Sequence, residues 1–419
     1  MKLKYNVEDR LPMGALATYS LQWFVLCIAV VSTSVFVAQG TPAEKLFYAQ
    51  RLFAVIGLAG LIQVIWGHRL PIVAGPASVL LVGVISALAS NASTDGIYTS
   101  IAIGGVIVAL LTVGNTMHYV QRLFTPRIIV VILMLIAFTL APTISTKLLY
   151  PPFASHDEHT FGLIFAIVGT VIMVIMNRTL RGVAKSLIVP VALIVGSVIY
   201  FSLFGMPEKH SSAVSLDNMF IDKVSFDASL IVAFVVCYIA LIINDIGSIE
   251  SLGKMLQSDN MPHRLKRGMA ITGVMNIVAG SMGVLGPVNF SMSPGIIAST
   301  GCAARRALIP ATLALILCAM SPDVIWVLTA IPTPVIGVIL LFLMGTQLAA
   351  SFEMLQSTKS AETFADALTM GVPLMVALVF QLMPTGVAPK LLEPLMGNGF
   401  AMGVLMVIIM EHVINRRKK

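Results

Sequence analysis

The residues that could do chemistry in this chain gather near the end of one long apolar run, residues 228–250. Four polar residues lie close together there: Asn244, Asp245, Ser248 and Glu250. An amide side chain both donates and accepts hydrogen bonds, as a planar amide-like ligand requires, and a carboxylate can take up a proton. The pattern therefore predicts a ligand site at Asn244 and Ser248, with Asp245 or Glu250 as a proton-coupling group.

The same residues also allow a structural interpretation. A charged side chain at the bilayer centre costs about 2.5–3.5 kcal/mol on insertion scales, so it needs a partner, a wet cavity or a function. Asp245 could belong to a buried network that fixes helix packing, and Glu250 could be an interfacial charge. Gln22, in the first apolar run, could likewise hold substrate or join two helices. The sequence leaves these alternatives open.

Two other apolar runs contain residues that interrupt helices. Run 70–90 carries Ala-Gly-Pro-Ala-Ser from residue 74, and run 288–303 carries Ser-Met-Ser-Pro-Gly from residue 291. Proline lacks a backbone donor and glycine permits extended backbone, so both runs should be partly non-helical. Such backbone survives in a membrane only when it is buried in protein or lines a wet cavity. These runs supply the further site candidates Gly75, Ala77, Ser78, Ser291, Met292, Ser293, Gly295 and Thr300.

The elements that must position these residues are membrane-spanning helices. The 419 residues are 58% hydrophobic and 11% charged, whereas soluble domains carry about 25% charged residues. About fourteen apolar runs approach the roughly 20 residues that a transmembrane helix needs. The fold class is therefore an all-α polytopic membrane protein, and a soluble enzyme is excluded.

The basic residues follow membrane topology. The net charge is +7, but Lys and Arg lie in the gaps between apolar runs and form no single patch, which argues against a nucleic-acid partner. With both termini in the cytoplasm, 20 of the 26 Lys and Arg residues fall on the cytoplasmic side. We expect a multi-pass protein of the plasma (inner) membrane with this orientation. His68 lies beside a basic loop and is expected to be interfacial.

The two interrupted runs occupy matching places. They are the third and the tenth of fourteen, so each is the third of its seven. Matched interruptions are the best sequence indication of a transporter site built on inverted repeats. A half-helix that begins near Gly295 would also point free N–H groups at the cavity. We expect seven plus seven inverted repeats with broken spans 3 and 10.

Other site chemistries find little support. The four cysteines are isolated, without a CxxC or Cys/His spacing, so we expect neither a disulfide framework nor a metal site, and no cofactor. A membrane-embedded hydrolase would need a nucleophile and base or an HExxH cluster inside the spans, and the sequence has neither. A channel fits paired broken helices less well than alternating access does.

The residues around the second interruption resemble a known signature. The signature of the nucleobase-ascorbate transporter family begins with Gln, Glu or Pro, followed by Asn, any residue and Gly. Four further residues, a Thr, and then Arg, Lys or Gly complete it. Gly295, Thr300 and Gly301 match this pattern. The resemblance extends to Leu21-Gln22, Gly67-His68-Arg69-Leu70-Pro71, Asn260-Met261-Pro262-His263-Arg264 and Pro332-Thr333-Pro334-Val335-Ile336-Gly337, and so covers nearly the whole chain.

The resemblance implies a core domain of spans 1–4 and 8–11 (residues 1–125 and 226–322) and a gate domain (residues 126–225 and 323–419). It also implies a homodimer and a substrate held between the halves of spans three and ten, facing span eight. Family members usually place a glutamate where Asn244 lies, and Gln or Glu followed by Asn where Met292 and Ser293 lie. Asp245, one residue on from Asn244, is the candidate substitute for that glutamate.

Together these observations predict a proton-coupled secondary active transporter, a symporter that imports a purine, a pyrimidine or a related planar heterocycle. The alternative is an inorganic or carboxylate anion transporter of sulfate permease-like architecture. Two half-helix N-termini would favour an anion, whereas Asp245 near the site disfavours one.

Overall fold

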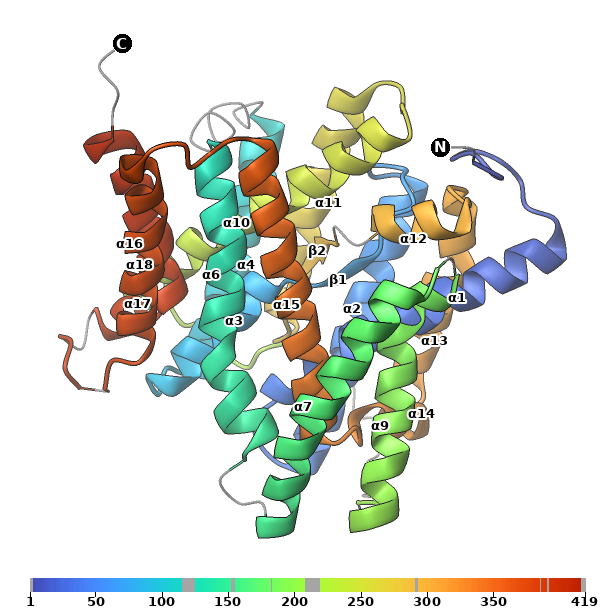
Figure 1. The fold of residues 1–419 in the computed structure, drawn as a ribbon, viewed down its shortest axis with the longest axis horizontal. Coiled ribbons are helices and arrows are strands. Elements are labelled where there is room, and N and C mark those ends of the chain that lie inside the picture. Colours follow the sequence, from blue (N-terminus) through green and yellow to red (C-terminus); the bar gives the residue numbers. More distant parts are fainter. Residues whose placement is uncertain are drawn as a thin grey trace.

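The computed structural model describes residues 3–114, 125–151, 155–181, 183–207, 219–290, 293–384, 386–389 and 392–415. Long helices make up most of the fold, and they surround two very short strands near the middle of the molecule (Figure 1). The N-terminal segment and the end of the last helix lie on the same side of the helix bundle (Figure 1).

Capping residues mark several helix boundaries in the first half. The Thr41 side chain accepts from the backbone N–H of Glu44, and the Glu44 carboxylate accepts from the Thr41 N–H, which forms a capping box. Ser155 and Glu158 begin α7 in the same way. The elements are α1 (Met13–Ser32), η1 (Val35–Val37), α2 (Pro42–Ile65), β1 (Ala74–Pro76), α3 (Ser78–Ala89), α4 (Thr94–Val113), α6 (Pro126–Thr143), η2 (Ile144–Leu149), α7 (His156–Thr179), α8 (Val183–Ser186) and α9 (Ile188–Phe204).

The second half again begins helices at capping residues and prolines. Thr363 and Asp366 form a capping box at the start of α16. The elements are α10 (Ala228–Met255), α11 (Met261–Ser281), β2 (Pro287–Asn289), α12 (Ser293–Thr300), η4 (Arg305–Ala307), α13 (Leu308–Met320), α14 (Pro322–Thr329), α15 (Thr333–Ser357), α16 (Phe364–Gln381), α17 (Glu393–Met396), α18 (Gly399–Ile409) and η5 (Met410–Ile414).

Both runs that the sequence predicts to be interrupted are interrupted. The third run consists of strand β1 followed by the 12-residue helix α3, and the tenth consists of strand β2 followed by the eight-residue helix α12. The strands pair antiparallel, with Gly75 opposite Val288. The extended backbone expected from glycine and proline is thus satisfied by a strand partner inside the protein.

The apolar stretch at residues 322–357 does not form one continuous helix. Residues 322–329 form the separate helix α14, which is bent by 98° against the preceding α13, and α15 begins only at Thr333. Pro322 lies at the start of α14 and Pro334 near the start of α15. Because proline fits the first turn of a helix and disrupts its interior, these prolines divide the apolar stretch into two helices.

Helices α4 and α11 approach each other closely. A Cβ atom added to Gly105 would lie 2.6 Å from the backbone N of Ile277, and one added to Gly280 would lie 2.4 Å from the N of Ala102. Small residues at such a contact let two backbones meet, as is typical of helix pairs in membranes. Helix α2 packs against α13, and a separate set of contacts joins α6, α15, α16 and α18.

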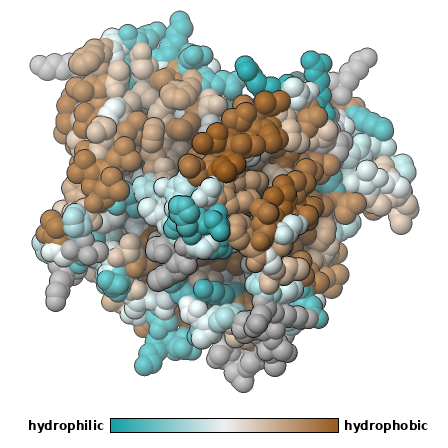
Figure 2. Space-filling model, turned by 60° about the horizontal axis from the view of Figure 1, so that its bottom comes forward, coloured by the Kyte–Doolittle hydropathy of each residue, from teal (hydrophilic) through white to brown (hydrophobic). Residues whose placement is uncertain are grey.

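The surface of the protein is that of a membrane protein. Eight helices in the described part of the chain are long and apolar enough to cross a bilayer, or nine if the bent pair α13–α14 counts as one span. Hydrophobic side chains cover broad areas of one face, whereas hydrophilic ones gather at its upper and lower edges and in a patch near its centre (Figure 2). The spans predicted at residues 70–90 and 288–303 fall below this length because each is split into a strand and a short helix.

Candidate functional site

The candidate site is built around the paired strands. Phe290 donates its backbone N–H to the Val73 carbonyl at 2.8 Å, and Ala77 donates to the Gly286 carbonyl at 2.9 Å, so hydrogen bonds continue past both ends of the pair. Helix α3 begins at Ser78 and helix α12 at Ser293, each a few residues after its strand. Two helix N-termini, each of which carries partial positive charge, therefore start next to the strand pair.

Asp245 anchors one of the strands. It lies on α10, its side chain is 0% exposed, and its carboxylate accepts from the Thr272 hydroxyl at 2.6 Å. The other oxygen accepts from the backbone N–H of Asn289 at 2.9 Å and from its side-chain amide at 2.7 Å. These contacts form a buried network of the kind that fixes helix packing, because the carboxylate links β2 to α10 and α11. Asp245 is thus a buried carboxylate that accepts hydrogen bonds from three donors beside the strand pair.

His68 extends this network, and it is buried inside the protein although it lies beside basic residues, as the sequence indicates. Its side chain is 0% exposed, and its Nε2 lies 3.0 Å from the Asn289 side-chain oxygen. Because Nδ1 accepts the backbone N–H of Leu70 at 3.0 Å, the proton of the neutral ring is on Nε2 and is donated to Asn289. Burial lowers the pKa of His68 to about 4, which keeps the ring neutral at pH 7.

The network has further buried members on α2, α10 and α11. Gln63 donates to the Thr272 hydroxyl at 3.1 Å, and Tyr238 donates to the Asn276 side-chain oxygen at 2.7 Å. Asn276 in turn donates to the Pro287 carbonyl at 2.9 Å. Side chains of several helices thus connect to β2 through hydrogen bonds, which fixes the strand pair in position.

The polar stripe on α10 divides between the interior and a more open side. Asn244 is half-buried, and its backbone carbonyl accepts from the buried Ser248 hydroxyl at 2.8 Å. Ser248 is therefore engaged with its own helix. Asn244 is the polar side chain of this stripe that could meet a ligand, whereas Asp245 points into the network.

Other predicted site residues also serve local structure. Ser293 is 0% exposed, and its hydroxyl accepts from the Val73 N–H at 3.0 Å, which links the start of α12 to the chain before β1. The Thr300 hydroxyl donates to the Ile296 carbonyl and accepts from the Cys302 N–H, at the end of α12. Gly75 and Ala77 contribute backbone at the strand pair, and Ser78 opens α3.

The remaining predictions fall in three places. Gln22 is buried in α1, with 8% exposure. Glu250 lies 3.6 Å from Lys254 one turn along α10, as an interfacial ion pair would, and its side chain is 40% exposed. Gly295 is part of α12. Ser291 and Met292 lie outside the described residues. The roles of Thr272, Asn276 and Asn289 were not predicted, because the only signal of these residues in the sequence is their polarity within apolar runs.

Gly75 occupies a position that tolerates no side chain. A Cβ there would lie 2.6 Å from the ring of Phe290 and 2.6 Å from Val30. We expect Gly75→Ala to displace the Phe290 ring and to destabilise the protein by about 1–3 kcal/mol, as overpacking does. Thermal melting in detergent measures this effect. Gly371→Ala is the matched control, because nothing lies within 4 Å of a Cβ at that position in α16.

Comparison with known proteins agrees with this geometry. Residues 14–386 match the model of the xanthine and uracil permeases, described as the permease family. The chain belongs to the permease family. This membership confirms the resemblance that the motifs indicated, and it places the protein among membrane transporters of small molecules, not enzymes.

Relatives of this permease share modest identity. A Clostridium perfringens protein named as a candidate purine permease is 24% identical over 298 residues, which are 70% of this chain and 66% of that protein. The xanthine permease XanP of Escherichia coli is 23% identical over 455 aligned residues, which cover 100% of this chain and 96% of XanP. Purine and xanthine permeases are thus among the relatives of this protein.

The fold recurs in a transporter of another kind. The transmembrane domain of a cyanobacterial bicarbonate transporter, BicA, superposes with a TM-score of 0.62 at 14% identity, covering 97% of this chain and 99% of that domain. At this identity the likeness concerns the fold alone. It shows that the permease has a transporter fold.

Proposed function

We propose that this permease imports a purine, a pyrimidine or a related planar heterocycle as a secondary active transporter. The observation that carries the proposal is the antiparallel pair β1–β2, with α3 and α12 beginning beside it and the half-buried Asn244 on α10, in a chain of the permease family. Backbone groups of the strands and the Asn244 amide would supply the donors and acceptors that a heterocycle edge needs.

In the proposed mechanism two parts of the molecule move against each other. The core domain would comprise residues 1–125 and 226–322, which contain both strands, and the gate domain residues 126–225 and 323–419. The architecture would be fourteen spans in seven plus seven inverted repeats. The spans would cross the plasma (inner) membrane, with both termini in the cytoplasm. Rocking of the core against the gate would expose the site to each side in turn.

Import would be driven by protons. Asp245 is the proposed coupling group, because it is a buried carboxylate hydrogen-bonded to β2 and so able to pass a change of charge to the strand pair. Glu250 suits this role less well, since its neighbour Lys254 and its exposure make it a surface ion pair. A homodimer is also proposed, and the mass of the purified protein in detergent tests it.

The site is tested at Asn244. We expect uptake of labelled xanthine, uracil, urate or another heterocycle of a panel to rise with expression in a transport-deficient host. Asn244→Leu should reduce that uptake at least fivefold, because an unpaired polar edge of a bound ligand costs about 1–3 kcal/mol. Asn177→Leu, the same substitution on the largely exposed helix α7, is the matched control.

Two results would contradict the proposal. Wild-type uptake in Asn244→Leu, at equal membrane abundance, would remove Asn244 from the site. Ligand-induced thermal stabilisation by bicarbonate or sulfate alone, with no heterocycle effective, would assign the protein to the anion transporters instead.

A further inference from the structure

The N-terminal segment, residues 3–10, is docked on the chain that follows α12. Lys4 donates its backbone N–H to the Gly301 carbonyl at 2.7 Å, and Ala303 donates to the Tyr5 carbonyl at 2.9 Å. Arg305 donates its backbone N–H to the Val7 carbonyl at 3.1 Å, and Tyr5 pairs with Cys302 in a parallel bridge. The segment therefore runs beside residues 301–305, joined to them by backbone hydrogen bonds and one isolated β-bridge, and we call it the strap.

The strap is also held by side chains. Leu3 and Val7 pack against the hydrophobic core, as does Leu11 directly after the strap. The ring of Tyr5 meets that of Tyr19 on α1 edge to face, at 6.1 Å between centroids. Cys302, the bridge partner of Tyr5, is 1% exposed. These apolar contacts and the backbone pairing are independent evidence that the strap has a defined position on the protein.

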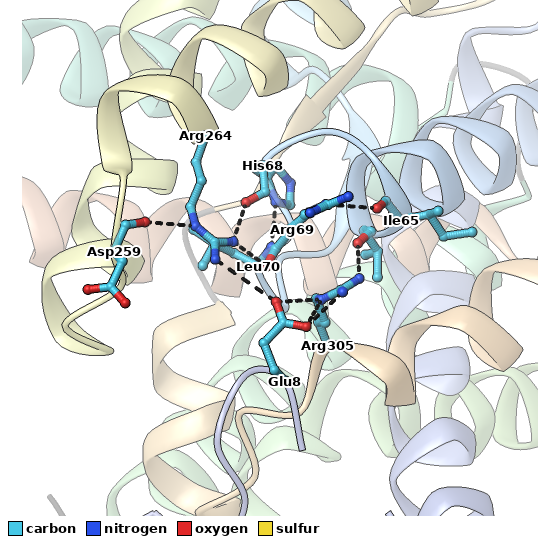
Figure 3. A network of polar contacts seen from close by, with 9 residues as sticks. Glu8, Ile65, His68, Arg69, Leu70, Asp259, Arg264 and Arg305 are labelled. Atoms are coloured by element: carbon cyan, nitrogen blue, oxygen red, sulfur yellow. Dashed lines mark hydrogen bonds and ion pairs between the residues drawn. The ribbon is translucent and has the colours of Figure 1, made fainter. Parts of the chain in front are cut away.

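Glu8 anchors the strap through ion pairs with two arginines (Figure 3). Its carboxylate accepts from Arg305 Nη2 at 2.7 Å and from Nε at 3.0 Å, a two-point contact, and lies 4.0 Å from Arg264 Nη2. These guanidinium groups are mostly buried, with side chains 14% and 19% exposed. The arginines hold the pKa of Glu8 below its usual value, chiefly through the Arg305 hydrogen bond.

Both arginines connect this carboxylate to the chain that enters β1. Arg264 donates to the carbonyls of His68 and Arg69, at 3.0 and 2.9 Å. Arg305 donates to the Val64 carbonyl, at the end of α2, at 2.8 Å. Figure 3 shows Glu8 lying between the two arginines, with the loop at His68–Leu70 beyond them. Glu8 thus joins the segment leaving α12 to the segment entering the other interrupted span.

We propose that the strap fixes the position of α12, and that Glu8 is a positioning residue for the site at which α12 begins. Helix α12 has eight residues, too few to be stable by itself. Its N-terminal end is tied at Ser293, and its C-terminal end continues into residues 301–305 under the strap. Loss of the Glu8 contacts would loosen the second of these ties. The consequence for transport rests on the proposed function, whereas the effect on α12 does not.

Hydrogen–deuterium exchange of the full-length protein in detergent tests the structural part. We expect Glu8→Gln to speed amide exchange in residues 293–305 by roughly two- to tenfold, a modest factor because Glu8 is half exposed and its ion pairs are partly screened. Exchange in α7 should not change. Glu362→Gln, the same loss of charge at an exposed position, is the control.

A covalent link provides the rescue. Paired strand residues lie about 4.8 Å apart, within the range of about 4.4–6.8 Å that a disulfide spans. Tyr5→Cys beside the native Cys302, oxidised in the Glu8→Gln background, should therefore restore slow exchange in α12. Reduction of that disulfide should remove the protection again.

Transport kinetics test the positioning role. Glu8→Gln should raise the KM for a heterocycle taken up by the wild type by at least threefold and leave maximal uptake per molecule within twofold, and the disulfide should reverse the change. Unchanged exchange in α12 would overturn the proposal, and so would faster exchange with an unchanged KM. If the wild type takes up no heterocycle, the proposed function fails, while the exchange experiment still decides whether the strap holds α12.

Discussion

Asp245→Leu is expected to lower the melting temperature of the purified permease by about 3 to 6 °C. The substitution leaves the Thr272 hydroxyl, the Asn289 backbone N–H and the Asn289 amide without their shared acceptor inside the protein. Each buried donor left unpaired costs about 1–3 kcal/mol, and since the three are coupled we expect a total of roughly 3–5 kcal/mol. Differential scanning fluorimetry in detergent measures it, with Leu241→Ile on the same helix as a control for repacking.

Asp245→Asn separates the anchoring role from the proposed coupling role. Its side-chain oxygen can still accept from Asn289, and its amide can donate to Thr272, so the melting temperature should stay within about 2 °C of the wild type. Because asparagine cannot take up a proton, we expect uptake against a gradient to be lost while exchange of labelled for unlabelled substrate continues. Counterflow in proteoliposomes, compared with pH-driven accumulation, measures this difference.

Two outcomes would contradict these roles. If Asp245→Leu melts at the wild-type temperature, the network does not hold β2. If Asp245→Asn accumulates substrate as the wild type does, another group carries the coupling proton, and the carboxylate serves packing alone.

The interrupted spans could be predicted from sequence because their signal is local. Glycine and proline restrict the backbone at the residue where they occur, so residues 74–78 and 291–295 show a break without knowledge of the fold. The pairing of the two breaks was suggested by their matching places in the chain. Their backbone register, with Gly75 opposite Val288, needed the structure.

The contacts of the site residues could not be predicted in this way. His68 and Asn289 are 221 residues apart, and nothing in either neighbourhood indicates the other. Helical spacing correctly separated Asn244 from Asp245 by about 100°, but it could not say which side faces the interior. The structure decides this, since Asp245 is 0% exposed and Asn244 half-buried. Burial of one polar side chain depends on partners that only tertiary packing supplies.

Arg127 shows the same gap between a local pattern and its tertiary role. In the sequence it is one of the basic residues that set topology. In the structure its guanidinium donates to the Ser360 carbonyl at 2.8 Å and lies 2.9 Å from Asp366 and 3.2 Å from Glu411. It therefore joins the start of α6 to α16 and to η5, which come from a distant part of the chain.

Replacing Arg127 with methionine is expected to be among the most damaging single changes outside the site. The carboxylates of Asp366 and Glu411 are 2% and 8% exposed, and they would face each other's charge without the cation between them. Removing one partner of a buried ion pair typically costs about 3–5 kcal/mol, because the remaining charge is left uncompensated. Thermal melting and the monodisperse fraction in size-exclusion chromatography measure the loss, with Arg178→Met, an exposed arginine on α7, as the control.

The partner charges and the geometry of arginine make separate contributions, which further variants distinguish. Arg127→Lys keeps the charge, but one ammonium cannot reproduce the fork that reaches two carboxylates and a carbonyl, so its melting temperature should fall between those of the wild type and Arg127→Met. Adding Glu411→Gln to Arg127→Met should recover part of the loss, because one of the two uncompensated charges is removed. If the double variant is no more stable than Arg127→Met, the damage comes from lost packing of the arginine side chain and not from stranded charge.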